Sequence, residues 1–179
     1  NTNDAPEFTS DLPESFTFPE DGSLIVDFTE YFDDIDIGDV LTLTALGDSN
    51  IAVNITGNDV TFTTSLVNWN GEENITFIVT DNSQEHASDS SNVNIIVTPV
   101  NDSPIINLPE SFIFSEDDSL ARDFSEYIDD VDLDDLNLSV SGGENVQVTI
   151  NSDSVTFNTP QHWNGSESLI FTVNDSLGR

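Results

Sequence analysis

The sequence contains an internal repeat with a period near 95 residues. Three short motifs recur at offsets of 98, 96 and 94: residues 3–6 (NDAP) at 101–104 (NDSP), residues 12–16 (LPESF) at 108–112, and residues 69–71 (WNG) at 163–165. Solenoid repeats are only about 20–50 residues long, whereas a unit of this length can enclose a hydrophobic core of its own. The repeat therefore predicts two domains in tandem, at residues 1–100 and 101–179.

Within each unit the local pattern is that of β-strands. Apolar side chains alternate with polar or small ones in residues 51–56 (IAVNIT) and 146–150 (VQVTI), which places one face in a core and the other in water. Residues 75–79 and 93–97 are more uniformly apolar, as in central strands. About seven strands per unit, separated by turn residues and without a convincing helix, predict an all-β fold. We expect two tandem antiparallel β-sandwiches of the Ig-like, Greek-key type.

The second unit ends before its last expected strand. Residues 171–175 align with 77–81, and the first unit then continues into the strand at 93–97, whereas only residues 176–179 follow in the second. One interpretation is that the sequence is cut short. The other is that a neighbouring chain donates a strand and thereby builds a filament, because an open sandwich exposes a sheet edge and part of its core.

The charge of the chain restricts its partners. It has 35 Asp and Glu against 2 Lys and Arg, a net charge of −33. Nucleic acid and anionic lipid need clustered Lys or Arg, and no apolar run approaches the ~20 residues that span a bilayer. We therefore expect no nucleic-acid partner and no membrane insertion. Cysteine is absent, and no motif predicts a catalytic pocket, so we expect no enzyme; cations, cationic surfaces and sugars remain as ligands.

Two acidic loops occupy matched positions between expected strands, at residues 33–39 (DDIDIGD) and 129–135 (DDVDLDD). Two carboxylates 4 Å apart repel by about 4 kcal/mol at an effective dielectric constant of ~20, and the chain has almost no basic residues to compensate. Ca²⁺ takes 6–8 oxygen ligands, whereas Zn²⁺ prefers Cys and His. The loops therefore predict Ca²⁺ binding; the alternative is a pair of solvated acidic loops.

Taken together, these motifs resemble bacterial cadherin-like tandem repeats of about 95 residues, found in large secreted or cell-surface proteins. The resemblance is carried by the NDAP and NDSP junctions at 3–6 and 101–104, the DIDIGD loop at 34–39 and the segment from WNG to VTD at 69–81. It implies cadherin-like β-sandwiches with Ca²⁺ at the junctions between domains. The chain would be a calcium-rigidified module of an extracellular adhesin or surface fibre. Its partners would be neighbouring repeats of the same polypeptide or fibre, with a glycan or cell-surface protein as a candidate target.

The resemblance also implies two sets of metal ligands. At the central junction the set would comprise Glu20, an acid from Glu72 or Glu73, Asn101, Asp102, Asp130, Asp132 and Asp175. A half-site facing a preceding domain would comprise Asn3, Asp4, Asp34, Asp36 and Asp81, and it should bind weakly or not at all in this chain. The second loop departs from the pattern, because Asp134 stands where the first has Gly38, and a glycine often marks a positive φ.

Two tryptophans leave a second functional class open. Trp69 and Trp163 could stack on sugar rings, which would make the chain a carbohydrate-binding module. Both occupy the same place in the repeat frame, which favours a structural role at the turn before the sixth strand of each unit.

Overall fold

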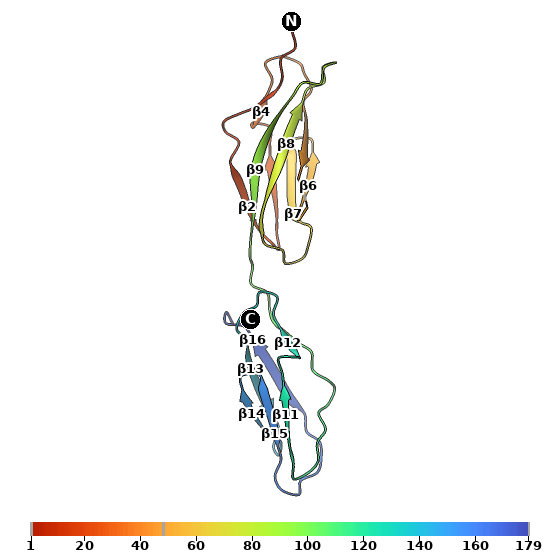
Figure 1. The fold of residues 1–179 in the computed structure, drawn as a ribbon, viewed down its shortest axis with the longest axis vertical. Coiled ribbons are helices and arrows are strands. Elements are labelled where there is room, and N and C mark those ends of the chain that lie inside the picture. Colours follow the sequence, from red (N-terminus) through yellow and green to blue (C-terminus); the bar gives the residue numbers. More distant parts are fainter. Residues whose placement is uncertain (1, 48, 179) are drawn as a thin grey trace. The chain divides into compact units, whose positions relative to one another are not determined.

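The computed structural model describes residues 2–47 and 49–178. The chain divides into two compact units, Asn1–Val100 (unit 1) and Asn101–Arg179 (unit 2), which are described one at a time. All regular elements of the described residues are β-strands (Figure 1), so the predicted all-β fold is confirmed. The described part of the chain has no helix that could cross a membrane.

Unit 1 is built from two main sheets and one short strand pair. The first sheet has the order β2 (Ser15–Pro19), β9 (Ser88–Thr98), β8 (Gly71–Thr80) and β5 (Thr42–Leu46), and the second has the order β3 (Ser23–Asp27), β7 (Asp59–Thr64) and β6 (Ile51–Thr56). The short pair is β1 (Glu7–Phe8) with β4 (Phe32–Asp33). All strand pairs of the described chain are antiparallel except β2 and β9, which run parallel. They come from opposite ends of the unit, so no hairpin fixes their relative direction.

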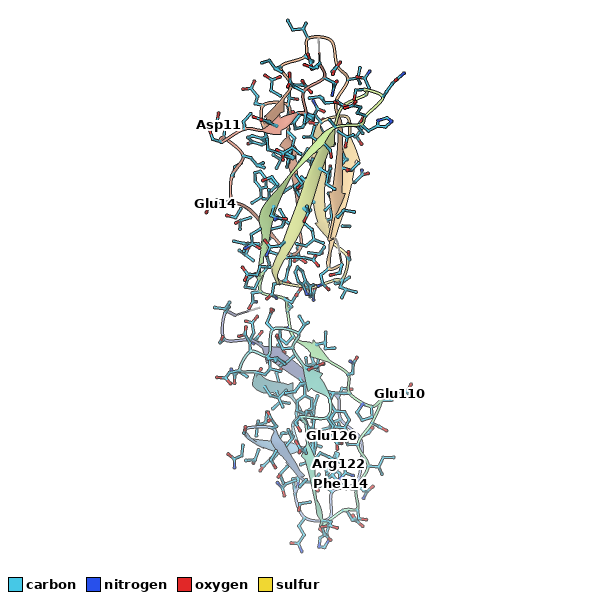
Figure 2. All side chains as sticks on the ribbon, turned by 45° about the horizontal axis from the view of Figure 1, so that its top comes forward. Asp11, Glu14, Glu110, Phe114, Arg122 and Glu126 are labelled. Carbon is cyan, nitrogen blue, oxygen red and sulfur yellow. The ribbon has the colours of Figure 1, made fainter. Side chains whose placement is uncertain are left out.

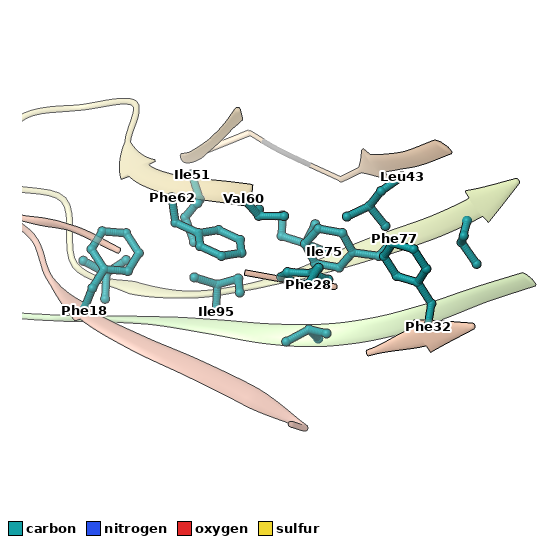
Figure 3. Packing of buried hydrophobic residues seen from close by; sticks show 13 residues of the cluster. Phe18, Phe28, Phe32, Leu43, Ile51, Val60, Phe62, Ile75, Phe77 and Ile95 are labelled. Atoms are coloured by element: carbon teal, nitrogen blue, oxygen red, sulfur yellow. The ribbon is translucent and has the colours of Figure 1, made fainter. Parts of the chain in front are cut away.

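The core of unit 1 lies between these two sheets (Figure 3). Along β8 the side chains of Ile75, Phe77 and Val79 are fully buried, and the residues between them are only partly buried. This is the period-2 pattern of a strand with one face in a core. Phe28 packs against Phe77 with ring centroids 4.7 Å apart. Buried aromatic pairs of this kind contribute about 0.5–1.5 kcal/mol beyond the area that they bury.

Unit 2 repeats the architecture with fewer paired strands. Its sheets are β11 (Ser119–Asp123), β15 (Ser154–Asn158) and β14 (Gln147–Asn151); β13 (Asn137–Gly142) with β16 (Leu169–Asn174); and β10 (Ile105–Ile106) with β12 (Ile128–Asp129). Within the described residues of unit 2 no strand takes the place that β9 has in unit 1. The expectation that the second sandwich lacks its last strand in this chain is thus confirmed for those residues.

Two segments of unit 2 form no strand, although their counterparts in unit 1 do, because the partner strand is missing. Residues 111–115 are the counterpart of β2, and residues 165–168 are the counterpart of the start of β8; neither is a strand. In unit 1, β2 pairs only with β9, and residues 71–75 of β8 also pair only with β9. Without that partner, these backbones have no ladder to join.

The core of unit 2 is correspondingly less enclosed. Phe124 and Val155 are fully buried, but Phe171 is only half-buried, whereas its counterpart Phe77 is fully buried. Phe114 is likewise half-buried. These differences fall on the side of the unit from which the strand is missing.

Candidate metal centres

The first acidic cluster forms where three segments of unit 1 meet. Asp34, Asp36 and Asp39 lie in the loop that follows β4, Asp81 directly follows β8, and residues 3–4 precede β1. The backbone N–H of Asp36 donates to Oδ1 of Asp34 at 2.8 Å, and that of Asp39 donates to the carbonyl of Asp36 at 3.3 Å. The first of these contacts is an Asx turn, in which an aspartate side chain replaces a backbone acceptor. The loop therefore curls so that its carboxylates converge.

Three carboxylates of this cluster come within reach of one ion. One oxygen each from Asp34, Asp39 and Asp81 lies within 4.8 Å of the other two. Oδ2 of Asp34 and Oδ2 of Asp39 are buried without a hydrogen-bond partner among the described residues. Burying a carboxylate oxygen without a partner is unfavourable, and a cation between these oxygens would remove that cost.

The electrostatic environment of Asp39 also favours a bound cation. Burial raises the pKa of its carboxyl group, and the charges of Asp34, Asp36 and Asp81 raise it further. By contrast, the pKa of Asp81 is lowered, chiefly by the hydrogen bond from the side chain of Asn3. Asp81 thus stays negatively charged although only 3% of its surface is exposed.

The segment before β1 is tied to the same carboxylates. Nδ2 of Asn3 donates to Oδ2 of Asp81 at 2.8 Å. The backbone N–H of Asp4 donates to Oδ2 of Asp36 at 2.8 Å. Asn3 therefore contacts one of the three converging carboxylates, and Asp4 contacts a further acid of the same loop.

Unit 2 repeats three hydrogen bonds of this scaffold. Nδ2 of Asn101 donates to Oδ2 of Asp175 at 2.7 Å, and the backbone N–H of Asp102 donates to Oδ2 of Asp132 at 2.7 Å. The N–H of Asp132 donates to Oδ1 of Asp130 at 2.8 Å. Asp130 and Asp175 are each only 5% exposed. These five residues, which the resemblance assigned to unit 2, are brought together in the structure.

In the second loop Asp134 stands where the sequence of the first loop has Gly38, and the structure shows that the turn is shifted by one residue. In the first loop Gly38 has a φ of +106° and Asp39 follows it, whereas in the second loop Leu133 has a φ of +61° and Asp134 follows. The residue in the left-handed region thus comes one position earlier. Asp134 is therefore the spatial counterpart of Asp39 and does not replace the glycine.

Asp39 and Asp134 were absent from the ligand sets expected from the sequence. Burial raises the pKa of the Asp134 carboxyl group, and the charges of Asp130, Asp132 and Asp175 raise it further. The same causes act on Asp39. The available signal was an acid at the end of each loop, Asp39 in the first and Asp134 or Asp135 in the second. Only the turn geometry identifies which acid faces the cluster.

The three glutamates expected from unit 1 have other contacts in that unit. Glu20 is 3% exposed; its Oε1 accepts from the backbone N–H of Val100 at 2.8 Å and its Oε2 from Nδ2 of Asn70 at 3.2 Å. Oε2 of Glu72 accepts from Nδ2 of Asn94 at 3.0 Å. Glu20 thus fixes the chain at the last residue of unit 1.

Glu73 anchors a loop. Its Oε1 accepts from the backbone N–H of Ser49 at 3.1 Å, and its Oε2 from those of Asn50 and Ile51 at 3.1 and 3.0 Å. Burial opposes its ionisation, but the hydrogen bonds from Ser49, Ile51 and Asn50 outweigh burial and lower its pKa. Both carboxylate oxygens are therefore already used by the fold, which argues against Glu73 as a metal ligand.

Glu167 has the same role in unit 2. It accepts backbone N–H groups from Glu144, Asn145 and Val146. Its pKa falls to about 2, first because of the N–H of Val146 and then because of the side chain of Asn145. The repeat therefore conserves the loop anchor between its two copies as well as the acidic cluster.

The tryptophans lie against glycines in the turn that leads into β8 and β16. Trp69 is half-buried and packs against the core of unit 1. A Cβ atom on Gly71 would lie 3.1 Å from the ring of Trp69, and one on Gly165 would lie 2.9 Å from the ring of Trp163. The glycines thus leave room for the indole rings, which supports the structural role for these tryptophans.

Comparison with known proteins places both units in one family of domains. A family model described as "Bacterial Ig domain" matches residues 3–96 and again residues 101–179. No curated protein sequence matches the chain. The confirmed expectation is the architecture: two tandem Ig-like, cadherin-like units.

Several solved structures are similar to the chain. The protocadherin GammaB4 extracellular domain has 23% identity and a TM-score of 0.55; the match covers 96% of this chain and 30% of that one. Protocadherin Gamma C5 EC1-3 has 14% identity and a TM-score of 0.48, over 94% and 66%. The Bacteroides ovatus mixed-linkage glucan utilization locus protein SGBP-B, in complex with a mixed-linkage heptasaccharide, has 15% identity and a TM-score of 0.40, over 99% and 45%. The first of these supports the fold, and the chain spans less than a third of its length.

Proposed function

Because the chain belongs to the family of bacterial Ig domains, present here in two tandem copies, we propose that it is a non-enzymatic structural module of an extracellular adhesin or surface fibre. Ca²⁺ binds the acidic cluster of each unit and orders the segment that enters the unit. The neighbouring repeats of the same polypeptide are its first partners. The cell surface or its surroundings are the proposed location.

One observation carries the proposal: the same donor set is assembled twice. In each unit an Asn, the Asp that follows it, and the acids of one loop and one strand end are held by matching hydrogen bonds. Carboxylate and amide oxygens are the ligands that Ca²⁺ takes, at 2.3–2.6 Å. The clusters contain no His, so their chemistry fits Zn²⁺ poorly.

We assign each site to residues of its own unit. The ligands proposed for the first site are Asn3, Asp4, Asp34, Asp36, Asp39 and Asp81, and those for the second are Asn101, Asp102, Asp130, Asp132, Asp134 and Asp175. The second site includes the first two residues after Val100. An ion there would therefore order the chain at the domain boundary, while Glu20 holds Val100 from the side of unit 1.

The expected affinity and stabilisation follow from general values. Extracellular Ca²⁺ modules bind with Kd of about 10⁻⁴–10⁻³ M. An ion present at 100 times Kd stabilises the native state by about 2.7 kcal/mol per site, which raises the melting temperature of a domain of this size by roughly 10 °C or more.

The test is a calcium titration of the chain by calorimetry, together with melting curves. We expect heats of binding and a melting temperature that rises with Ca²⁺ and falls when a chelator is added. An equal concentration of Mg²⁺ should have a smaller effect, because Mg²⁺ demands near-ideal octahedral geometry and keeps several of its waters. A melting curve that is the same in Ca²⁺ and in chelator, with no heat of binding, would refute the proposal.

Two matched variants test the assignment of the ligands. Asp39→Asn and Asp134→Asn should each weaken the calcium site of one unit by on the order of tenfold or more, since they remove one carboxylate. In chelator each should stabilise the protein at neutral pH, because a raised pKa means that ionisation of these carboxyl groups opposes folding. Glu14→Gln and Glu110→Gln are the controls: both lie on outer loops (Figure 2), 96 positions apart. Equal calcium binding by all four variants would contradict the assignment.

A further inference from the structure

One edge of unit 1 lacks the charged residues that are common in the rest of the chain. The two main sheets of the unit end in β2 and β5 and in β3 and β6, and β2 and β6 lie at opposite margins of the unit (Figure 1). β2 ends in Pro19 and β3 in Asp27, whereas β5 and β6 contain neither proline nor charge. Charged residues and proline usually protect an edge strand against pairing with another chain. β6, the longer of the two, is therefore an unprotected edge.

The uncharged stretch is longer than the strand itself. Residues 49–58 contain no Asp, Glu, Lys or Arg, although the chain has 35 Asp and Glu in 179 residues. The stretch comprises β6, the two residues before it and the two-residue turn into β7. The counterpart strand β14 of unit 2 differs, because Glu144 lies shortly before it and Asp153 lies in its turn. The lack of charge is therefore a property of the β6 edge rather than of the repeat.

The hydrogen bonds of β6 identify its outward backbone groups. In an antiparallel ladder, alternate residues bond to one neighbouring strand and the residues between them point away from it. The carbonyl of Asn50 accepts from the residue that follows β7, whereas the N–H of Ile51 donates to Oε2 of Glu73 at 3.0 Å. Val53 and Ile55 therefore direct their N–H and C=O groups away from β7, as Ile51 does. On that side β6 has no partner strand among the described residues.

The side chains that face solvent along β6 are small or neutral. Ala52, Asn54 and Thr56 are exposed, and the residues between them are buried or partly buried. Asn54 lies in one cross-strand row with Thr61 of β7 and Ile25 of β3. A further strand can therefore extend this sheet at the β6 edge without meeting a charged or bulky exposed side chain on β6.

The absence of charge indicates which kind of partner fits this edge. A cationic partner is attracted to the acidic surfaces of a chain with a net charge of −33, and β6 offers it nothing. A strongly acidic partner is repelled by those surfaces and approaches most easily at an uncharged strip. A second copy of the chain is such a partner, and it carries an identical unpaired edge.

We propose that two copies of the chain associate through their β6 edges, which pair as antiparallel strands about a two-fold axis. Such an interface uses the same patch on both partners. Val53 of one copy forms a hydrogen-bonded pair with Ile55 of the other, and the two Asn54 side chains lie directly opposite each other. This register leaves the bond between Ile51 and Glu73 intact, and the three-stranded sheet of one copy continues into that of the other.

Analytical ultracentrifugation of the whole 179-residue chain tests the association. The runs are made in chelator, so that a failure of this proposal is distinguishable from a failure of the calcium sites. A concentration-dependent dimer should form. Its dissociation constant should fall as NaCl is raised, because salt screens the repulsion between two acidic chains. A chain that stays monomeric up to its solubility limit, in low and in high salt, would overturn the proposal.

Charge changes at the centre of the interface give a sharper test. Asn54→Asp and Asn54→Lys should each weaken the dimer about tenfold or more, because each places two like charges directly opposite. An equimolar mixture of the two variants should recover the dimer, since opposite charges then face each other. Ile25→Asp is the matched control, because it adds a charge in the same row at the other edge of the sheet, where the side chain is 66% exposed. It should leave the dissociation constant unchanged.

Hydrogen exchange locates the interface. As the dimer forms, amide protection should rise at Val53 and Ile55, whereas Ala52 and Asn54, whose N–H groups face β7, should change little. Three further results would overturn the proposal. They are dimers of the Asn54 variants as strong as those of the parent chain, a mixture of the two variants that stays monomeric, and protection that rises on other strands but not on β6.

Discussion

At the scale of single residues, one backbone angle in each acidic loop decides which carboxylate enters the cluster. Gly38 adopts a φ of +106° without a Cβ to oppose it, and Leu133 holds a φ of +61° despite its branched side chain. Left-handed backbone costs an ordinary L-residue roughly 1–2 kcal/mol. The turn that brings Asp134 to the place of Asp39 therefore carries backbone strain at Leu133.

This strain can be measured by exchanging the residue types. Leu133→Gly should raise the free energy of unfolding by up to about 1 kcal/mol, because it removes left-handed strain at a side chain that buries almost nothing. Gly38→Ala should lower it by about 1–3 kcal/mol. Urea denaturation provides the measurement, with the exposed neighbour Ile37→Ala as control. A destabilised Leu133→Gly protein would show that this conformation carries no net strain.

The loop anchor Glu167 predicts a specific dependence on pH. Its pKa is about 2 in the folded unit, below the ordinary value of 4.5. Its contribution to stability is therefore complete above about pH 4.5 and is lost as pH falls toward 2. The difference in unfolding midpoint between the parent protein and Glu167→Gln should be constant from neutral pH to about 4.5 and should shrink below it. A difference that does not change with pH would contradict this assignment.

At the scale of elements, strand formation in this chain depends on partners far away in the sequence. Residues 12–16 and 108–112 are identical in sequence. Nevertheless the first copy leads into β2 at residues 15–19, whereas the matching residues 111–115 form no strand. The difference follows from pairing, because β2 exists as a strand only beside β9.

The presence or absence of the strand β9 also determines how much stability a core substitution removes. Phe18→Ala should destabilise the protein by about 3–5 kcal/mol, the usual cost of removing a buried Phe, because Phe18 is 3% exposed. Phe114→Ala at the matched position should cost clearly less, because its ring is only half-buried. Urea unfolding of the two variants compares them directly. Equal losses would show that the core of unit 2 is closed in solution.

At the scale of the whole molecule, the net charge of −33 opposes compactness. Repulsion among exposed carboxylates is screened over about 10 Å at 0.1 M salt. A bound divalent cation acts differently, since it neutralises a particular group of buried oxygens. Screening of the surface charge by salt and binding of Ca²⁺ at the clusters should therefore have different effects on stability.

Melting curves in NaCl with chelator, and in CaCl₂ without it, can separate the two effects. Increasing NaCl should raise the melting temperature gradually as repulsion is screened. CaCl₂ at about 10 mM, without chelator, should raise it well beyond about 30 mM NaCl, which has the same ionic strength. If the two salts act alike, the stabilisation is screening alone, and the acidic clusters are solvated loops.

The sequence by itself was sufficient for the features that depend on local pattern and on the repeat. Alternating apolar residues predict the strands, because burial of one face imposes a period of two. The offsets of 94 to 98 predict the two copies and match the loop acids Asp34 and Asp36 of the first to Asp130 and Asp132 of the second.

Tertiary structure decided what depends on contacts between distant residues. It brings Asp81 to the first loop and Asp175 to the second, selects Asp39 and Asp134 through the turn, and binds both oxygens of Glu73 to backbone N–H groups. A linear pattern reports which side of a strand is buried, but hydrogen-bond partners and converging charges are fixed only when segments far apart in the chain pack together.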